Sequence, residues 1–275
     1  MADVHVHNFQ RMDEYSEQLE KVRAFIEEDS KKFNKEECRI VISGDIVHSK
    51  STISNELIAF VATWIRELEQ ICQVIVISGN HDQVIGNSTR LDTLTAIFTA
   101  AGFHNSIHLD SYFGYNSGIL VDDNITWALF SIFSDFKHPD IEKSRKEHPD
   151  NIVVGLYHGP VIGSDLQNGQ KIENGTDRAL FESCDYVMAG DIHKRQMIKI
   201  GKCEFVYPGS VIQQTFGETV MNHGIVIWDV DVDLKGKQKL KWEFKDINSD
   251  YGLYNFEITS PDDVDNDREK LTNLR

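Results

Sequence analysis

The sequence lacks the signatures of several common protein classes. Its four cysteines stand far apart, at Cys38, Cys72, Cys184 and Cys203, and no Cys-x-x-Cys pair indicates a zinc ribbon or a redox motif. No apolar run approaches the roughly 18–20 residues that cross a bilayer, and the chain does not begin with a basic segment followed by an apolar one. We therefore expect a cytoplasmic protein in a reducing compartment, without contact to a membrane.

Basic residues are also scarce. Lys and Arg number 28 against 44 Asp and Glu, which gives a formal net charge of -16. This balance argues against a broad basic surface that would grip a polyanion, so any contact with nucleic acid must be local. Acidic runs such as residues 27–29 and 261–269 are typical of solvated surface.

The chain contains enough apolar residues to fold. Hydrophobic residues make up 40% of its 275 residues, and we find neither low-complexity segments nor internal repeats. This length suits one large domain, alone or with a small one. Near residue 240 an alternating apolar pattern leads into a charged tail. We therefore expect a first domain over 1–235 and the beginning of a second, incomplete domain over 236–275.

Apolar runs and helical periodicity alternate along the chain. Buried strands are predicted at 39–43, 73–78, 151–157 and 185–189, and amphipathic helices at 12–33, 54–72 and 88–102. In the second helix Ser54 is the expected cap, and the expected buried face is Leu57, Ile58, Val61, Ile65 and Leu68. Shorter runs at 118–121, 125–130, 197–200, 204–207 and 223–231 predict mixed or antiparallel strands, with one or two more after Leu240. The fold class that follows is α/β, a two-sheet β-sandwich flanked by helices.

Metal-competent side chains follow the predicted strands or begin the chain. In five segments they are Asp3, His5, Asp45, Asn80, His81, Asp82, His158, Asp191 and His193. Ligands gather at the carboxyl ends of strands in open α/β sheets, and residues i and i+2 of an extended chain share a face. A lone Asp-x-His pair would be weak evidence, but five separate segments that carry metal-competent side chains favour one shared site. Nitrogen and oxygen ligands without thiolates suit manganese, iron, zinc or magnesium, and a two-metal set suits hydrolysis of a phosphate ester.

The five segments resemble the motifs of calcineurin-like metallophosphoesterases. They read ADVHVH, SGDIVH, SGNHD, YHGP and AGDIHKRQ, in the order that this family uses. Within the superfamily, GDIVHSKSTIS and the succession HKRQ, YPGSVIQQTFGE and HGIVIWDV are similar to SbcD-type DNA-repair nucleases. The resemblance covers about residues 1–255. It implies the metallophosphoesterase fold, with a nuclease domain over 1–235 and the start of a capping or DNA-binding domain over 236–275.

The resemblance also implies roles for individual residues. A first metal would be held by Asp3, His5, Asp45 and His193, and a second by Asp45, Asn80, His158 and Asp191, with Asp45 bridging. His81 would be the catalytic histidine beside the scissile phosphate, where it can protonate the departing oxygen. Asp82 and His48 would orient their neighbours. For Asp82, a plain turn-capping role is an equal alternative.

Two features depart from the family pattern. Only Met1 and Ala2 precede Asp3, so the strand that normally leads into the first motif is missing. We expect either a fragment or weak anchoring of Asp3 and His5. The second departure is Asp191, which stands where the family usually has histidine. We expect two divalent metal ions, with Mn²⁺, Mg²⁺, Fe²⁺ and Zn²⁺ as the candidates. An added carboxylate is a harder ligand than an imidazole, so it favours Mn²⁺ or Mg²⁺ over Zn²⁺.

The activity that the resemblance implies is metal-dependent hydrolysis of DNA phosphodiester bonds, exonucleolytic with endonucleolytic cleavage left open, in repair or recombination. The partners that it implies are DNA, a coiled-coil ATPase subunit of the SbcC type and a second copy of the chain. Two alternatives stay open. One is a phosphomonoesterase or small-molecule phosphodiesterase on the same scaffold, and the other is a non-catalytic metal-binding scaffold. The presence of Asn80, His81 and His158 argues against the last.

Overall fold

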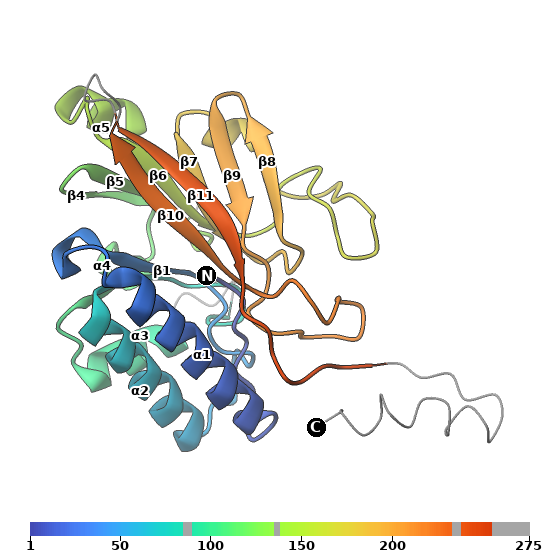
Figure 1. The fold of residues 1–275 in the computed structure, drawn as a ribbon. Helices are drawn as coiled ribbons and strands as arrows, with labels where there is room; N and C mark the ends of the chain where they lie inside the picture. Colours follow the sequence, from blue (N-terminus) through green and yellow to red (C-terminus); the bar gives the residue numbers. More distant parts are fainter. Residues whose placement is uncertain (85–89, 135–137, 233–237, 255–275) are drawn as a thin grey trace, which may run out of the picture.

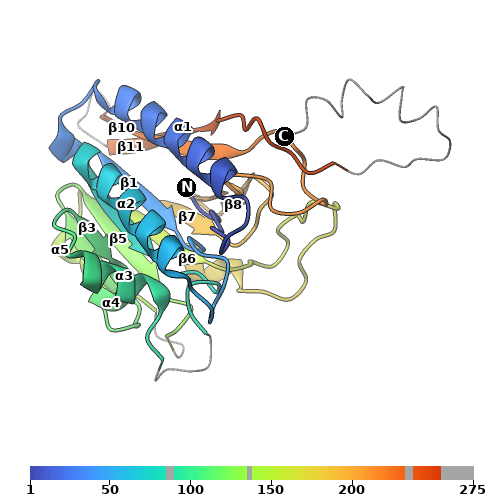
Figure 2. The ribbon, with the colours of Figure 1, turned by 90° about the horizontal axis from the view of Figure 1, so that it is seen from below.

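The first of three sheets is covered on one face by a layer of helices. The computed structural model describes residues 1–84, 90–134, 138–232 and 238–254 (Figure 1). Three parallel strands form this sheet, β1 (Arg39–Ser43), β2 (Gln73–Ile77) and β3 (Ser106–His108), in the order β1-β2-β3. Figure 2 shows three helices side by side against it, α1 (Met12–Ser30), α2 (Asn55–Ile71) and α3 (Thr93–Ala101). Buried side chains such as Ile42, Val61 and Val76 fill the space between the helices and the sheet.

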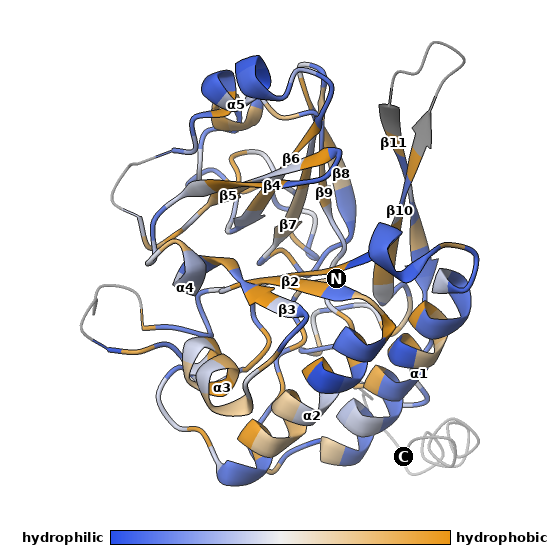
Figure 3. Ribbon diagram, turned by 90° about the vertical axis from the view of Figure 1, so that its left-hand side faces the viewer, coloured by the Kyte–Doolittle hydropathy of each residue, from blue (hydrophilic) through white to orange (hydrophobic). Residues whose placement is uncertain are grey.

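The second sheet contains six strands in the order β4-β5-β6-β7-β9-β8. They are β4 (Gly118–Asp122), β5 (Ile125–Phe130), β6 (Ile152–His158), β7 (Tyr186–Gly190), β8 (Gln196–Ile200) and β9 (Cys203–Tyr207). Strands β5, β6, β7 and β9 are parallel, while β4 and β8 pair antiparallel at the two edges. Ile75, Leu129 and Leu156 belong to a buried cluster between the two sheets, which lie face to face in Figure 3. The predicted two-sheet sandwich flanked by helices is confirmed.

A long hairpin forms the third sheet, in which β10 (Gly224–Val232) pairs antiparallel with β11 (Gln238–Asp246). It packs against the second sheet, where the Tyr186 hydroxyl donates a hydrogen bond of 2.9 Å to the Leu240 carbonyl. The hairpin runs across the boundary that we expected between residues 235 and 236. A second domain over 236–275 stays a prediction, since residues 255–275 lie outside the described part of the chain.

The sequence pattern predicted the cap of helix α2 and most of its buried face. Ser54 caps it as expected, because its side chain accepts a hydrogen bond from the Leu57 backbone N–H. Of the residues expected on its buried face, only Ile58 is not buried; it is 37% exposed, and Trp64 packs into the core instead. No helix in the described ranges is long and apolar enough to cross a membrane.

Several short elements were not expected from the sequence. They are the helices α4 (Leu109–Tyr112) and α5 (Ile141–Glu147) and the 3₁₀ turns Lys35–Glu37 and Arg178–Phe181. Helix α1 ends at Ser30 rather than at residue 33, and α3 begins at Thr93 behind the cap Asp92. Part of the start that we expected for α3 falls on residues 85–89, outside the described residues.

Candidate metal centre

Polar loops at the carboxyl ends of four strands meet the N-terminal segment. Residues 44–48 follow β1, residues 78–82 follow β2, His158 ends β6, and residues 191–193 follow β7. Parallel pairing brings these ends to one edge of the sandwich. The loops gather all seven candidate ligands, Asp3, His5, Asp45, Asn80, His158, Asp191 and His193, with His48, His81 and Asp82 beside them.

The N-terminal segment is held by its neighbours. The backbone N–H groups of Asp3 and His5 donate to the carbonyls of Gly44 and Asp45, at 3.1 and 2.9 Å. Asp3 is 0% exposed and His5 is 3% exposed. Weak anchoring of these two residues, one of our two expectations, is therefore wrong. Pairing with the loop after β1 does what we had assigned to a preceding strand.

Asp45 lies at the centre of the cluster. Its Oδ2 atom is 3.4 Å from His5 Nε2 and 3.3 Å from His158 Nε2. Its Oδ1 atom accepts a hydrogen bond of 2.8 Å from the backbone N–H of His81. Gly79 permits this close approach, because a Cβ at that position would overlap the Asp45 carboxylate. One carboxylate thus faces two imidazoles and a neighbouring loop.

His5 and His193 form one side of the centre. Their Nε2 atoms are 3.1 Å apart, and Asp3 Oδ1 lies 4.0 Å from the first and 3.9 Å from the second. Two nitrogens on one tetrahedral ion, each about 2.0–2.1 Å from it, stand roughly 3.3 Å apart, so these two have the separation of shared ligands. His5 Nδ1 is buried and has no partner among the residues described.

His158, Asn80 and Asp191 lie on the other side of Asp45. His158 Nδ1 donates to the Ser43 carbonyl at 2.7 Å, which leaves Nε2 free to bind an ion. That Nε2 atom is 3.3 Å from Asn80 Oδ1 and 4.0 Å from Asp191 Oδ1. The Asp191 carboxylate therefore stands with the expected second set of ligands. That it binds an ion stays a prediction.

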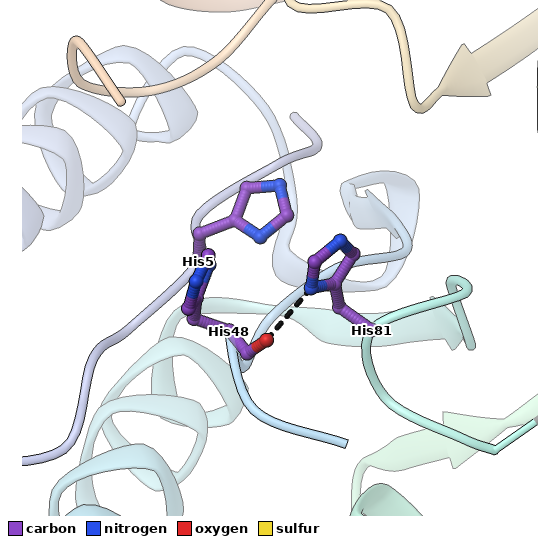
Figure 4. Close-up of side chains that lie close together, drawn as sticks. All are labelled: His5, His48 and His81. Carbon is purple, nitrogen blue, oxygen red and sulfur yellow. Dashed lines mark hydrogen bonds between the residues drawn. The ribbon is translucent and has the colours of Figure 1, made fainter. Parts of the chain in front are cut away.

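His81 stands beside His5 and His48 at the rim of the cluster (Figure 4). Its ring centroid is 4.7 Å from that of His5 and 5.2 Å from that of His48. His81 Nδ1 donates to the His48 carbonyl at 2.7 Å, so Nε2 is the nitrogen left to exchange a proton. His48 thus orients His81 through its backbone, whereas its exposed ring stacks on His7 with centroids 3.8 Å apart.

Asp82 connects two of the loops. Its Oδ2 accepts a hydrogen bond of 2.8 Å from the Gly79 N–H, and its Oδ1 accepts one of 3.0 Å from the Val47 N–H. The first bond caps the turn of Asp82 itself, and the second ties that turn to the loop after β1. These bonds are compatible with both of the roles considered for Asp82, and its part in the function stays a prediction.

Burial and mutual attraction set the ionisation of the cluster. Burial raises the pKa of Asp3 to about 7. Burial acts in the same direction on Asp45, but the nearby His158 and His5 outweigh it and hold the pKa of Asp45 below its ordinary value. Among the described residues, no Lys or Arg forms an ion pair with Asp3, Asp45 or Asp191, whose charged partners are histidines. Buried carboxylates and imidazoles without a basic partner fit divalent cations.

Two groups behind the centre were not found from the sequence. The first is the Ser43 carbonyl, a backbone group that no side-chain motif can mark. The second is Glu218, whose buried Oε1 accepts a hydrogen bond of 2.9 Å from His193 Nδ1. Glu218 ends the stretch YPGSVIQQTFGE, so the similarity of that stretch to SbcD-type nucleases was the available signal.

Comparisons with known proteins identify the family of the chain. A family model, that of the calcineurin-like phosphoesterase superfamily domain, matches residues 1–232. Uncharacterized protein R555 of Acanthamoeba polyphaga mimivirus is 32% identical over 266 residues. The match covers 94% of this chain and 18% of that protein, so the chain spans less than a fifth of the length of this relative.

Solved structures also resemble the chain. A protein described as a 5′-nucleotidase from Staphylococcus aureus, in complex with alpha-ketoglutarate, has a TM-score of 0.54 at 17% identity, over 99% of this chain and 57% of its own. The nuclease MPE of Pseudomonas putida has a TM-score of 0.30 at 17% identity, over 63% of this chain and 66% of its own. The first likeness supports the fold alone, and the second is too low to support an argument.

Proposed function

The chain belongs to the calcineurin-like phosphoesterase superfamily, and from this membership and the geometry of the centre we propose that it is a two-metal DNA nuclease. Members of the superfamily hydrolyse phosphoesters with two divalent metal ions. The reaction that we propose is hydrolysis of phosphodiester bonds in DNA during repair or recombination. Its main mode is exonucleolytic, with endonucleolytic cleavage as a second mode.

One observation supports the two-metal part of the proposal. A single oxygen, Asp45 Oδ2, lies within 3.4 Å of imidazole nitrogens from both sides of the centre. A carboxylate in that position can bridge two ions. The first ion would be held by Asp3, His5, Asp45 and His193, and the second by Asp45, Asn80, His158 and Asp191. We propose Mn²⁺, because three carboxylates and an amide offer hard oxygen ligands beside the imidazoles.

The residues of the protein contribute to the proposed reaction mainly by holding the reacting groups in position. When bound, the two ions would supply Lewis-acid activation of water and of the phosphoryl group. Asp45 holds the backbone of His81 beside the centre, and the His48 carbonyl fixes the His81 ring. Because Nδ1 is engaged there, Nε2 can give a proton to the departing sugar oxygen. General acid catalysis of this kind contributes roughly 10²–10⁴-fold to a rate.

DNA as the substrate rests on the similarity of residues 44–54 and 193–230 to SbcD-type nucleases. A net charge of -16 gives the chain little general attraction for a polyanion. We therefore propose that DNA is bound jointly with a coiled-coil ATPase subunit of the SbcC type, by a homodimer of this chain. We place the reaction in the reducing cytoplasm, where the four free cysteines are stable.

Cleavage of a labelled DNA duplex in Mn²⁺, compared with hydrolysis of an aryl phosphate, tests the proposal. The parent is expected to release nucleotides from DNA and to hydrolyse the aryl phosphate poorly. His81→Asn is expected to lose roughly 10²–10⁴-fold in DNA cleavage while its Mn²⁺ binding is retained. His104→Asn is the control, because His104 is exposed and precedes β3, at the opposite edge of the first sheet.

The two alternatives give different results in the same experiment. Hydrolysis of the aryl phosphate without cleavage of DNA would favour the phosphomonoesterase. Binding of Mn²⁺ with neither activity would favour the non-catalytic scaffold. Cleavage of DNA at the same rate in His81→Asn as in the parent would contradict the role of His81.

A further inference from the structure

The buried carboxylate of Glu218 contacts the centre from behind. Its Oε1 accepts a hydrogen bond of 2.9 Å from His193 Nδ1, and the side chain is 3% exposed. Its Oε2 accepts hydrogen bonds of 3.0 Å each from Ser210 Oγ and from the Gln214 N–H. Thr215 Oγ1 also donates to Oε1, at 3.4 Å, and a carboxylate held by four donors cannot turn toward solvent. Its orientation toward His193 is therefore built into the fold.

The loop that carries Glu218 also contacts the segment that carries His5. Gln214 Nε2 donates to the Val4 carbonyl at 3.1 Å. The Tyr15 hydroxyl donates to the His5 carbonyl at 2.6 Å and lies 3.5 Å from Gln214 Oε1. Residues 210–218 thus support both segments whose imidazoles converge at the first metal position.

His193 and His158 differ in the group that holds their Nδ1 atoms. His158 donates to the neutral Ser43 carbonyl, whereas His193 donates to the Glu218 carboxylate. A carboxylate behind an imidazole keeps the proton on Nδ1 and makes Nε2 a stronger donor to a metal ion. Partners of this kind are typically worth about 10–100-fold in metal affinity. The carboxylate therefore adds negative charge to the first metal position and not to the second.

We propose that Glu218 is a positioning residue for the first metal. It holds His193 with Nε2 directed toward His5 and Asp3, and it strengthens the binding of a divalent ion at that position alone. This inference rests on the two-metal centre proposed above. Glu218 acts through His193, so its removal changes the affinity of one ion before it changes any step of the reaction.

Calorimetric titration of the metal-free chain with Mn²⁺ tests this role. The parent is expected to bind two ions. Glu218→Gln keeps the size of the side chain but removes its charge, and it is expected to weaken one site by about 10–100-fold while the other stays within about twofold. Glu69→Gln is the matched control. Glu69 is also buried and also accepts from a serine hydroxyl and a backbone N–H, those of Ser106 and Asn105, but it contacts no candidate ligand.

A double variant identifies the weakened site. His193→Asn is expected to weaken the same site, and adding Glu218→Gln is expected to cause no further loss, because Glu218 acts through His193. Glu218→Asp, which keeps the charge on a shorter side chain, is expected to lose less affinity at this site, and it serves the same test if Glu218→Gln does not fold.

The outcomes separate this inference from the proposed function. A parent that binds two ions, with a Glu218→Gln isotherm within about twofold of it, would overturn the role of Glu218 alone. Equal weakening of both sites, or additive losses in the double variant, would overturn it as well. A parent that binds fewer than two ions would overturn the two-metal proposal, and this inference with it.

Discussion

Asp82 satisfies two backbone groups from different loops, and its removal therefore tests how the centre is held together. Its carboxylate accepts from the Val47 N–H at 3.0 Å and from the Gly79 N–H at 2.8 Å. All three residues are buried, so solvent does not reach these two N–H groups in the parent. Asp82→Ala would leave two buried donors unpaired, each at about 1–3 kcal/mol. We expect the free energy of unfolding to fall by about 2–6 kcal/mol.

Asp82→Asn separates hydrogen bonding from packing. The amide has a similar size, and its oxygen can accept from one N–H, but its NH₂ group would face the other donor. We expect a loss of about 1–3 kcal/mol. Asp140→Ala is the comparison, because Asp140 caps α5 through one hydrogen bond from the Lys143 N–H at an exposed position. Loss of such a cap costs about 1 kcal/mol.

Urea unfolding in EDTA measures these differences without a contribution from bound metal. Tryptophan fluorescence follows the transition, since Trp64 and Trp127 are both buried in the core. A loss below about 1 kcal/mol for Asp82→Ala would refute the reasoning, because the Val47 and Gly79 N–H groups would then have found other partners. In a parallel titration Asp82→Ala is expected to bind Mn²⁺ more weakly, because the loops on either side of Asp45 lose their connection.

Three further changes test the centre. Asp191→Ala is expected to abolish DNA cleavage, whereas Asp191→His keeps it, shifts the metal preference toward Zn²⁺ and raises aryl phosphate hydrolysis relative to DNA cleavage. Equal nuclease activity in Asp191→Ala and the parent would contradict a ligand role. Gly190→Ala is expected to destabilise the protein by about 1–3 kcal/mol in urea and to weaken Mn²⁺ binding, because the new Cβ would overlap both partners of the hydrogen bond from His158 to Ser43. An unchanged urea midpoint would count against this close contact. In EDTA, Asp3 is expected to contribute a fall in stability of up to roughly 4 kcal/mol as the pH rises from about 4 to about 8. Burial raises the pKa of Asp3 from 3.8 to about 7, so its contribution is complete below the unfolded pKa and is lost as the pH rises through the folded one. Asp3→Asn should remove this contribution, and a fall in stability that is smaller in the parent than in Asp3→Asn over the same range would show that the sign is wrong.

The position of the centre was predictable because its residues follow strands that local patterns reveal. Residues 39–43 were predicted with the bounds that β1 has, and residues 125–130 with those of β5. An apolar run that stops at Gly-Asp or Gly-Asn-His-Asp marks both the end of a strand and the side chains that follow it. Parallel pairing then brings such ends to one edge of the sandwich.

Contacts between distant segments were not predictable in this way. Glu218 meets His193 across 25 positions of sequence, and no periodicity relates the two. The face of α2 was misassigned at Ile58 because the elements packed against the helix, rather than its own period, decide which side chains are covered. Helices α4 and α5, of four and seven residues, are shorter than the windows over which periodicity is visible.

The carboxylate at position 191 bears on which phosphate ester the centre accepts. Asp3, Asp45 and Asp191 bring three negative charges to the two proposed dications, where histidine at position 191 would leave two. The centre therefore keeps less positive charge for its substrate. A phosphodiester carries one negative charge, while a phosphate monoester carries about 1.5 to 2 near neutral pH, so the smaller residual charge disfavours the monoester more. The proposed preference for a diester and the departure from the family at Asp191 thus share one electrostatic cause, and for this reason Asp191→His is expected to gain more on the aryl phosphate than on DNA.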